Sequence, residues 1–151
     1  FLPRQEEWRV SASYVNGLAA CRGQEIPVVL PWIFGPPTPF FRNLAQVYFF
    51  GRYDQQPSRL TVLAPQEFSP QGASPALRAL YGQRLAGGCP VLAWGVHDLK
   101  PDRVEALRED IAATGGVPRE KVRVRVFNRY AVKLLGKVKA RPSAWVFEIA
   151  R

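Results

Sequence analysis

The feature of this chain that most constrains its fold is an alternation of cationic and apolar residues between Arg119 and Arg141. Nine of the twelve odd positions in this stretch are Lys or Arg, whereas the even positions are mostly apolar, beginning with Val122, Val124 and Val126. Successive side chains of a β-strand point to opposite faces, so a period of two predicts a strand with one apolar and one cationic face. We expect at least residues 121–125 to bury their valines against a core and to present their cations to solvent.

The same stretch carries most of the net charge of the protein. Its nine cations accompany a single acid, Glu120, so it contributes +8 to the formal net charge of +9. Charge runs on solvated faces usually mix both signs, whereas a one-sided run is typical of a surface that meets an anion, such as nucleic acid, an acidic protein or a membrane surface. The competing explanation is a solvated face with Phe127 packed under a helix and with the cations paired to Glu109, Asp110, Glu120 and Glu148.

Residues 128–140 fit two different periods. With a period of two they continue the basic strand, whereas with a period of 3.6 they form a helix whose apolar face comprises Tyr130, Ala131, Leu134, Leu135 and Val138. In that helix Arg129, Lys133 and Lys137 lie four residues apart, on one face. Both interpretations keep the cations together, so the expected anionic partner does not depend on the choice.

Apolar periodicity along the rest of the chain predicts an α+β fold. Strands are expected at residues 7–15, 24–30, 46–53, 58–64, 90–97 and 145–150, and helices at about 39–45, 75–86 and 101–114. The strand at 90–97, the helix after it and the returning strand at 122–126 make a strand–helix–strand unit over residues 90–127, whose length suits a crossover connection. We therefore predict a single domain over residues 1–151, with an antiparallel or mixed sheet covered by two or three helices.

Cysteine spacing and hydropathy argue against two classes of protein, those with a structural zinc site and those with a membrane span. Cys21 and Cys89 lie 68 positions apart in a chain with one histidine, which excludes the usual structural zinc spacing. Because unpaired cysteines are among the most buried residues, we expect two reduced, buried thiols rather than a disulfide. The longest apolar run, residues 26–34, contains two prolines and is far shorter than the roughly 20 residues that cross a bilayer. We expect no membrane span, no cofactor and a cytoplasmic location.

The charge pattern favours nucleic acid as the anion. Lys and Arg neutralise phosphates, and an aromatic residue such as Phe127, which interrupts the cationic positions, can stack on an exposed base. The chain contains no zinc-finger, RRM, KH or basic-zipper sequence, so we expect backbone-directed binding of single-stranded DNA or RNA with weak sequence preference. The predicted binding residues are Lys121, Arg123, Arg125, Phe127, Arg129, Lys133, Lys137, Lys139 and Arg141.

An interaction or assembly protein is the first alternative. The proline-rich stretch 31–41 carries Trp32, Phe34, Phe40 and Phe41, more apolar surface than a loop normally hides. If exposed, it would serve protein–protein contact or formation of a homo-oligomer. Packing of Trp32 and Phe34 into the core explains the same residues.

An enzyme of the nuclease or transferase type is the second alternative. His97 and Asp98 follow the strand predicted at 90–96, where α/β units often place functional groups, and a histidine there could act as a general base. However, Asp98 equally suits the N-cap of the next helix, and the acids of the chain form no metal-binding motif. We therefore expect a non-enzymatic protein with no catalytic or metal-binding residues.

Overall fold

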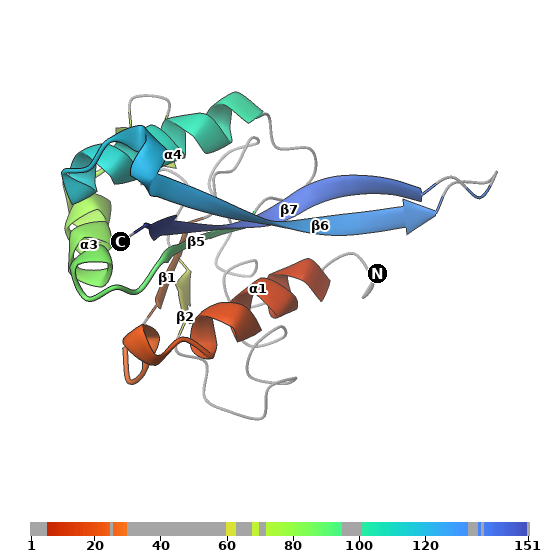
Figure 1. Cartoon of the computed structure of the whole chain (residues 1–151), viewed down its shortest axis with the longest axis horizontal. Helices are drawn as coiled ribbons and strands as arrows, with labels where there is room; N and C mark the ends of the chain where they lie inside the picture. The colour runs from red at the N-terminus through yellow and green to blue at the C-terminus, as the bar shows by residue number, and fades with distance from the viewer. Residues whose placement is uncertain are drawn as a thin grey trace.

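The structure is a computed structural model (Figure 1), and it describes residues 6–24, 26–29, 60–62, 68–69, 72–94, 101–132, 136 and 138–150. The described helices are α1 (Glu6–Asn16), α3 (Pro75–Ala86) and α4 (Pro101–Gly115), with short 3-10 turns η2 (Ala19–Cys21) and η5 (Arg119–Lys121). The described strands are β1 (Ile26–Val29), β2 (Leu60–Val62), β3 (Phe68–Ser69), β4 (Gly72–Ala73), β5 (Val91–Trp94), β6 (Val122–Val132) and β7 (Val138–Ile149).

The main sheet is mixed, with the strand order β2-β1-β5-β7-β6. Strands β2, β1 and β5 run parallel to one another, whereas β7 is antiparallel to both of its neighbours, β5 and β6. Strands β5 and β6 therefore point the same way and are connected through α4, with β7 between them. This arrangement confirms the predicted α+β class, the mixed sheet and the strand–helix–strand unit at 90–127.

Helices cover both faces of the sheet. Figure 1 shows α1 on one side of the strands and α3 and α4 on the other. Side chains of the central strand alternate between two buried clusters, because Leu92 and Trp94 pack with α1 while Val91 and Ala93 pack with α3 and α4. The centre of the sheet is thus buried on both faces, and only β6 and the end of β7 offer strand surface at the edge where the basic stretch lies.

The helices after residue 74 begin and end as the sequence predicts. Helix α3 starts with Pro75 after the N-cap Ser74, whose side chain accepts a hydrogen bond from the backbone amide of Leu77 at 3.2 Å. Helix α4 ends at Gly115, and Gly116 follows with a φ of +63°, a conformation that favours glycine. The helix predicted at 39–45 and the strand predicted at 46–53 lie outside the described residues.

Residues 7–15 form most of helix α1, so the strand predicted there is wrong. The residues that α1 buries are spaced as i, i+3, i+4 and i+7, namely Trp8, Ser11, Ala12 and Val15. Two residues made this helical spacing resemble the period of two of a strand. Val10 is apolar but 49% exposed, and Ser11 is polar but fully buried, because its hydroxyl donates to the carbonyl of Trp8 and accepts from Nε1 of Trp94.

Cys21 and Cys89 form a disulfide, which corrects the prediction of two reduced thiols. Both residues are fully buried, so their predicted burial is confirmed and only their bonding was missed. Cys21 precedes β1 and Cys89 precedes β5, and these strands are parallel neighbours. Parallel strands begin at the same edge of a sheet, so this pairing brings the two sulfur atoms together across 68 positions of sequence.

The ambiguous residues 128–140 are resolved as strand rather than helix wherever they are described. Strand β6 continues to Val132, and β7 begins at Val138. Gly136 lies between them with a φ of +74°, a left-handed conformation that favours glycine. Of the cations in this stretch, Arg129 therefore lies on β6 and Lys139 on β7, the two arms of a β-hairpin.

Candidate nucleic-acid interface

Strands β6 and β7 form the long antiparallel hairpin that carries the predicted binding residues; we call it the basic hairpin (residues 122–149). Its pairing runs from Val122 opposite Ile149 to Val132 opposite Val138. Figure 1 shows the two strands extending past the helices, while their other ends lie in the main sheet, with β6 at its edge. The basic hairpin is thus part of the core at one end and an arm at the other.

A bulge marks the place where the register of the basic hairpin shifts. Phe127 lies opposite Ala144 and Asn128 opposite Pro142, so Ser143 has no partner in the register. The carbonyl oxygen of Ser143 instead accepts a hydrogen bond from Nε1 of Trp8 at 3.1 Å. Helix α1 therefore satisfies the backbone group that the bulge leaves unpaired, and holds the basic hairpin at the point where it leaves the core.

The two faces of β6 differ as the alternation predicts near its start, but not throughout. Val122 is fully buried and Val124 packs at the margin of the cluster under α3 and α4, whereas Val126 is 44% exposed. On the other face Arg123 and Arg125 are exposed, and Phe127 is half-buried against the cluster under α1. The valine face of β6 thus changes from fully buried at Val122 to exposed at Val126.

Tyr14 of α1 organises the cationic face of the strand. The guanidinium carbon of Arg125 lies 4.5 Å from the centroid of the Tyr14 ring, a cation–π contact, and the Phe127 ring lies 6.0 Å from the same ring. The Tyr14 hydroxyl donates a short hydrogen bond to Oε1 of Glu148 on β7. That hydrogen bond, followed by burial and the negative charge of Glu148, raises the pKa of Tyr14, and the nearby Arg125 partly opposes the shift.

The predicted binding residues that the structure describes lie on the basic hairpin or immediately before it. Lys121 is exposed at the end of η5, immediately before β6. In the register of the basic hairpin, Arg129 lies opposite Arg141, and Lys139 lies opposite Ala131. Lys133 and Lys137 lie outside the described residues.

Three acids near these cations interact with other side chains. Asp110 on α4 forms an ion pair with Arg78 of α3, and Glu105 forms one with Arg119. Glu148 is the register partner of Arg123, but its recorded hydrogen bond comes from Tyr14. In the part of the chain that the structure describes, no salt bridge joins a carboxylate to the exposed cations Lys121, Arg123 and Arg125.

Tyr14 and Glu148 were missed as members of this site. Glu148 was considered only as a counter-ion, and Tyr14 was assigned to a strand. One signal was available in the sequence: on a helix with Ser11 and Val15 buried, Tyr14 lies at the border of the buried face, where it can reach the sheet. The contact with Glu148 spans 134 positions and has no local signal.

The features behind the alternative functions are not described by the structure. His97, Asp98 and the stretch 31–41 all lie outside the described residues. Among the residues that are described, no three His, Cys, Asp or Glu side chains gather as a metal site, and no helix is long and apolar enough to cross a membrane.

Comparison of the chain with protein-family models, curated proteins and solved structures found no match.

Proposed function

We propose that this protein binds nucleic acid through the basic hairpin, by contacts to the phosphate backbone with weak sequence preference. The observation that carries the proposal is that Lys121, Arg123 and Arg125 are exposed and form no salt bridge with a carboxylate among the described residues. A strand that lies at the edge of the sheet and keeps its cations unpaired is suited to neutralising a series of phosphates.

The cross-strand register of the basic hairpin adds to this argument. Arg129 and Arg141 occupy directly opposite positions, and like charges at opposite positions destabilise an antiparallel pair. A polyanion lying along the basic hairpin would neutralise charges at both positions. An antiparallel pair with cations at facing positions is therefore suited to an anionic partner.

Single-stranded DNA or RNA is the substrate that we favour. Tyr14 and Phe127 place two aromatic rings beside Arg125, and both residues are only half-buried, so part of each ring remains accessible to an unstacked base. Stacking on aromatic rings beside a cationic track is how single-strand binders gain affinity without reading sequence.

Duplex binding is the second candidate, and the shape of the basic hairpin favours it. A two-stranded antiparallel ribbon fits the major groove of B-DNA, which is about 12 Å wide, and proteins use such ribbons there. The part of β6 and β7 that extends past the helices in Figure 1 has this form. Single- and double-stranded oligomers of one sequence distinguish the two candidates.

The test is fluorescence anisotropy with labelled single- and double-stranded DNA and RNA over a range of salt concentrations. The variant Arg123→Gln/Arg125→Gln removes two charges from the basic hairpin. The control variant, Arg22→Gln/Arg84→Gln, also removes two charges, but outside the basic hairpin and near the disulfide. Arg22 follows Cys21 in the chain, and the backbone carbonyl of Arg84 accepts a hydrogen bond from the backbone amide of Cys89.

If both arginines contact phosphates, the hairpin variant should lower the slope of log affinity against log salt by about 1.4 for a single strand, at about 0.7 per phosphate. The control variant should keep the slope of the wild type. Absence of binding to every oligomer at low salt, or equal slopes in the two variants, would contradict the proposal.

A further inference from the structure

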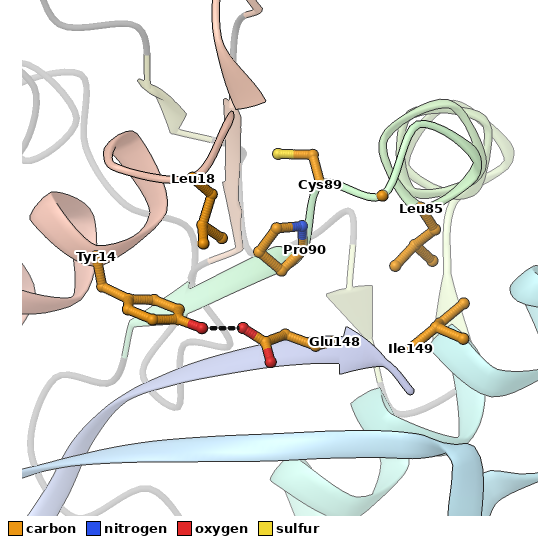
Figure 2. A pocket seen from close by; sticks show the side chains of 8 residues that line it. Tyr14, Leu18, Leu85, Cys89, Pro90, Glu148 and Ile149 are labelled. Atoms are coloured by element: carbon orange, nitrogen blue, oxygen red, sulfur yellow. Dashed lines mark hydrogen bonds between the residues drawn. The ribbon is translucent and has the colours of Figure 1, made fainter. Parts of the chain in front are cut away.

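A cavity of about 310 Å³ lies at the end of the sheet away from the closed end of the basic hairpin. Its walls come from α1, the turn after α1, the end of α3, the residues before β5 and the end of β7. Figure 2 shows Tyr14 and Leu18 on one side of this space, Leu85 and Ile149 on the other, and Glu148 between them. The lining residues are Tyr14, Leu18, Leu85, Gly88, Cys89, Pro90, Glu148 and Ile149.

The cavity has one polar end and an apolar remainder. Leu18, Leu85 and Ile149 present aliphatic side chains, whereas the polar atoms of the lining side chains are the Tyr14 hydroxyl and the Glu148 carboxylate. The Tyr14 hydroxyl donates a hydrogen bond to Oε1 of Glu148, so its single donor is in use. A carboxylate accepts hydrogen bonds at both oxygens, and no partner is recorded for Oε2 within the described residues.

Glu148 is the acidic group of the lining, so this end of the cavity selects a donor with positive charge. Neither neighbouring cation forms a salt bridge with Glu148 in the described structure: Arg125 lies over the ring of Tyr14 and near its hydroxyl, and Arg123 is the register partner of Glu148. A charge-assisted hydrogen bond from an ammonium group is about twice as strong as a neutral one.

The size and rigidity of the cavity limit the ligand to a small molecule. Its volume is at the lower end of the range of about 300–1,000 Å³ found for small-molecule sites, enough for one ring or a short alkyl chain. One wall is held by the disulfide at Cys89, by Pro90 and by Gly88, whose φ is +82°. A wall that is fixed before binding loses little entropy when a ligand enters.

We propose that this cavity binds a small amphipathic amine, whose ammonium group contacts Glu148 and whose apolar body packs against Leu18, Leu85 and Ile149. This site is separate from the phosphate contacts proposed for the basic hairpin. It requires the carboxylate of Glu148 and the volume of the cavity, and does not require nucleic acid.

Isothermal titration calorimetry on the full chain with its disulfide intact tests the proposal. The probes are phenethylamine, the uncharged phenethyl alcohol and the anion phenylpropionate. We expect the amine to bind about tenfold more tightly than the alcohol, because a hydrogen bond to a charged group is worth more than a neutral one, and phenylpropionate to show no binding. Equal affinity for the amine and the alcohol, or no binding of the amine, overturns the proposal.

Two variants separate the role of the charge from that of the cavity. Glu148→Gln keeps the size of the side chain and its ability to accept from Tyr14, so it should abolish the preference for the amine over the alcohol. Leu85→Phe, or Leu18→Phe if the first variant fails to fold, fills the cavity and should abolish binding of both probes. Glu120→Gln removes an exposed acid outside the cavity and should change neither. A Glu148→Gln variant that keeps the preference for the amine would refute the assignment of Glu148.

Discussion

Removal of the disulfide between Cys21 and Cys89 should lower the free energy of unfolding by about 4 kcal/mol. The bond closes a loop of 68 residues in the unfolded chain. In the chain-entropy model a loop of this length removes roughly 15 cal/mol/K from the entropy of the unfolded state, which is about 4 kcal/mol at room temperature. For a chain of 151 residues, this loss corresponds to a fall in Tm of roughly 10–15 °C.

The assay is urea denaturation of the wild type and of Cys21→Ala/Cys89→Ala, each with and without a thiol reductant. Fluorescence reports unfolding because Trp8 and Trp94 are buried and stacked with their ring centroids 4.9 Å apart. We expect the reductant to bring the wild type to the stability of the double variant and to leave the variant unchanged. The m value should also rise when the bond is absent, because an unfolded chain without the cross-link exposes more surface.

Two outcomes would refute this reasoning. Titration of two free thiols in wild type denatured without reductant would show that the bond does not form. A difference in unfolding free energy below about 1 kcal/mol, with the bond present, would show that loop closure does not limit the unfolded state of this chain.

Three further predictions concern α1 and α3. Ser74→Ala should lower the unfolding free energy by about 1 kcal/mol in urea denaturation, because it removes the N-cap of α3. Trp8→Ala should lower it by roughly 3–5 kcal/mol in the same assay, since this fully buried ring stacks on Trp94. Tyr14 should ionise above its ordinary pKa of 10.0 when tyrosinate absorbance of the wild type is compared with Tyr14→Phe. Because the folded state binds this proton more tightly, the stability difference between these two proteins should be constant below about pH 10 and shrink as the pH rises above it.

Elements with their own local signals were predictable from the sequence. Helix α3 has a capping serine followed by proline, and α4 has a glycine terminus and an apolar face with Leu107 and Ile111 buried. Strand β6 begins with alternating valine and arginine residues. In each case the residues that determine the element lie within it or beside it, so tertiary contacts were not needed to recognise it.

Elements and contacts that depend on distant residues were not predictable. Helix α1 was missed because Ser11 belongs to its buried face only through its bond to Trp94, 83 positions away. The disulfide depends on β1 and β5 being neighbours, and nothing within either segment specifies that pairing. The candidate site shows the same division: the cations were found from their spacing, whereas Tyr14 entered only once α1 was placed against β7.

The register of the basic hairpin leads to a final prediction, in which stability and binding change in opposite directions. Arg141→Gln leaves one charge where two like charges face each other in the register, at positions 129 and 141. It should raise the unfolding free energy by roughly 0.2–1 kcal/mol, while weakening nucleic-acid binding. Lys139→Gln is the matched control, because its register partner is Ala131 and its removal relieves no like-charge pair. It should weaken binding without a gain in stability. Urea denaturation and anisotropy on the same two variants measure both quantities. If Arg141→Gln stabilises the fold and leaves binding unchanged, the pair of arginines is retained for some reason other than an anionic partner.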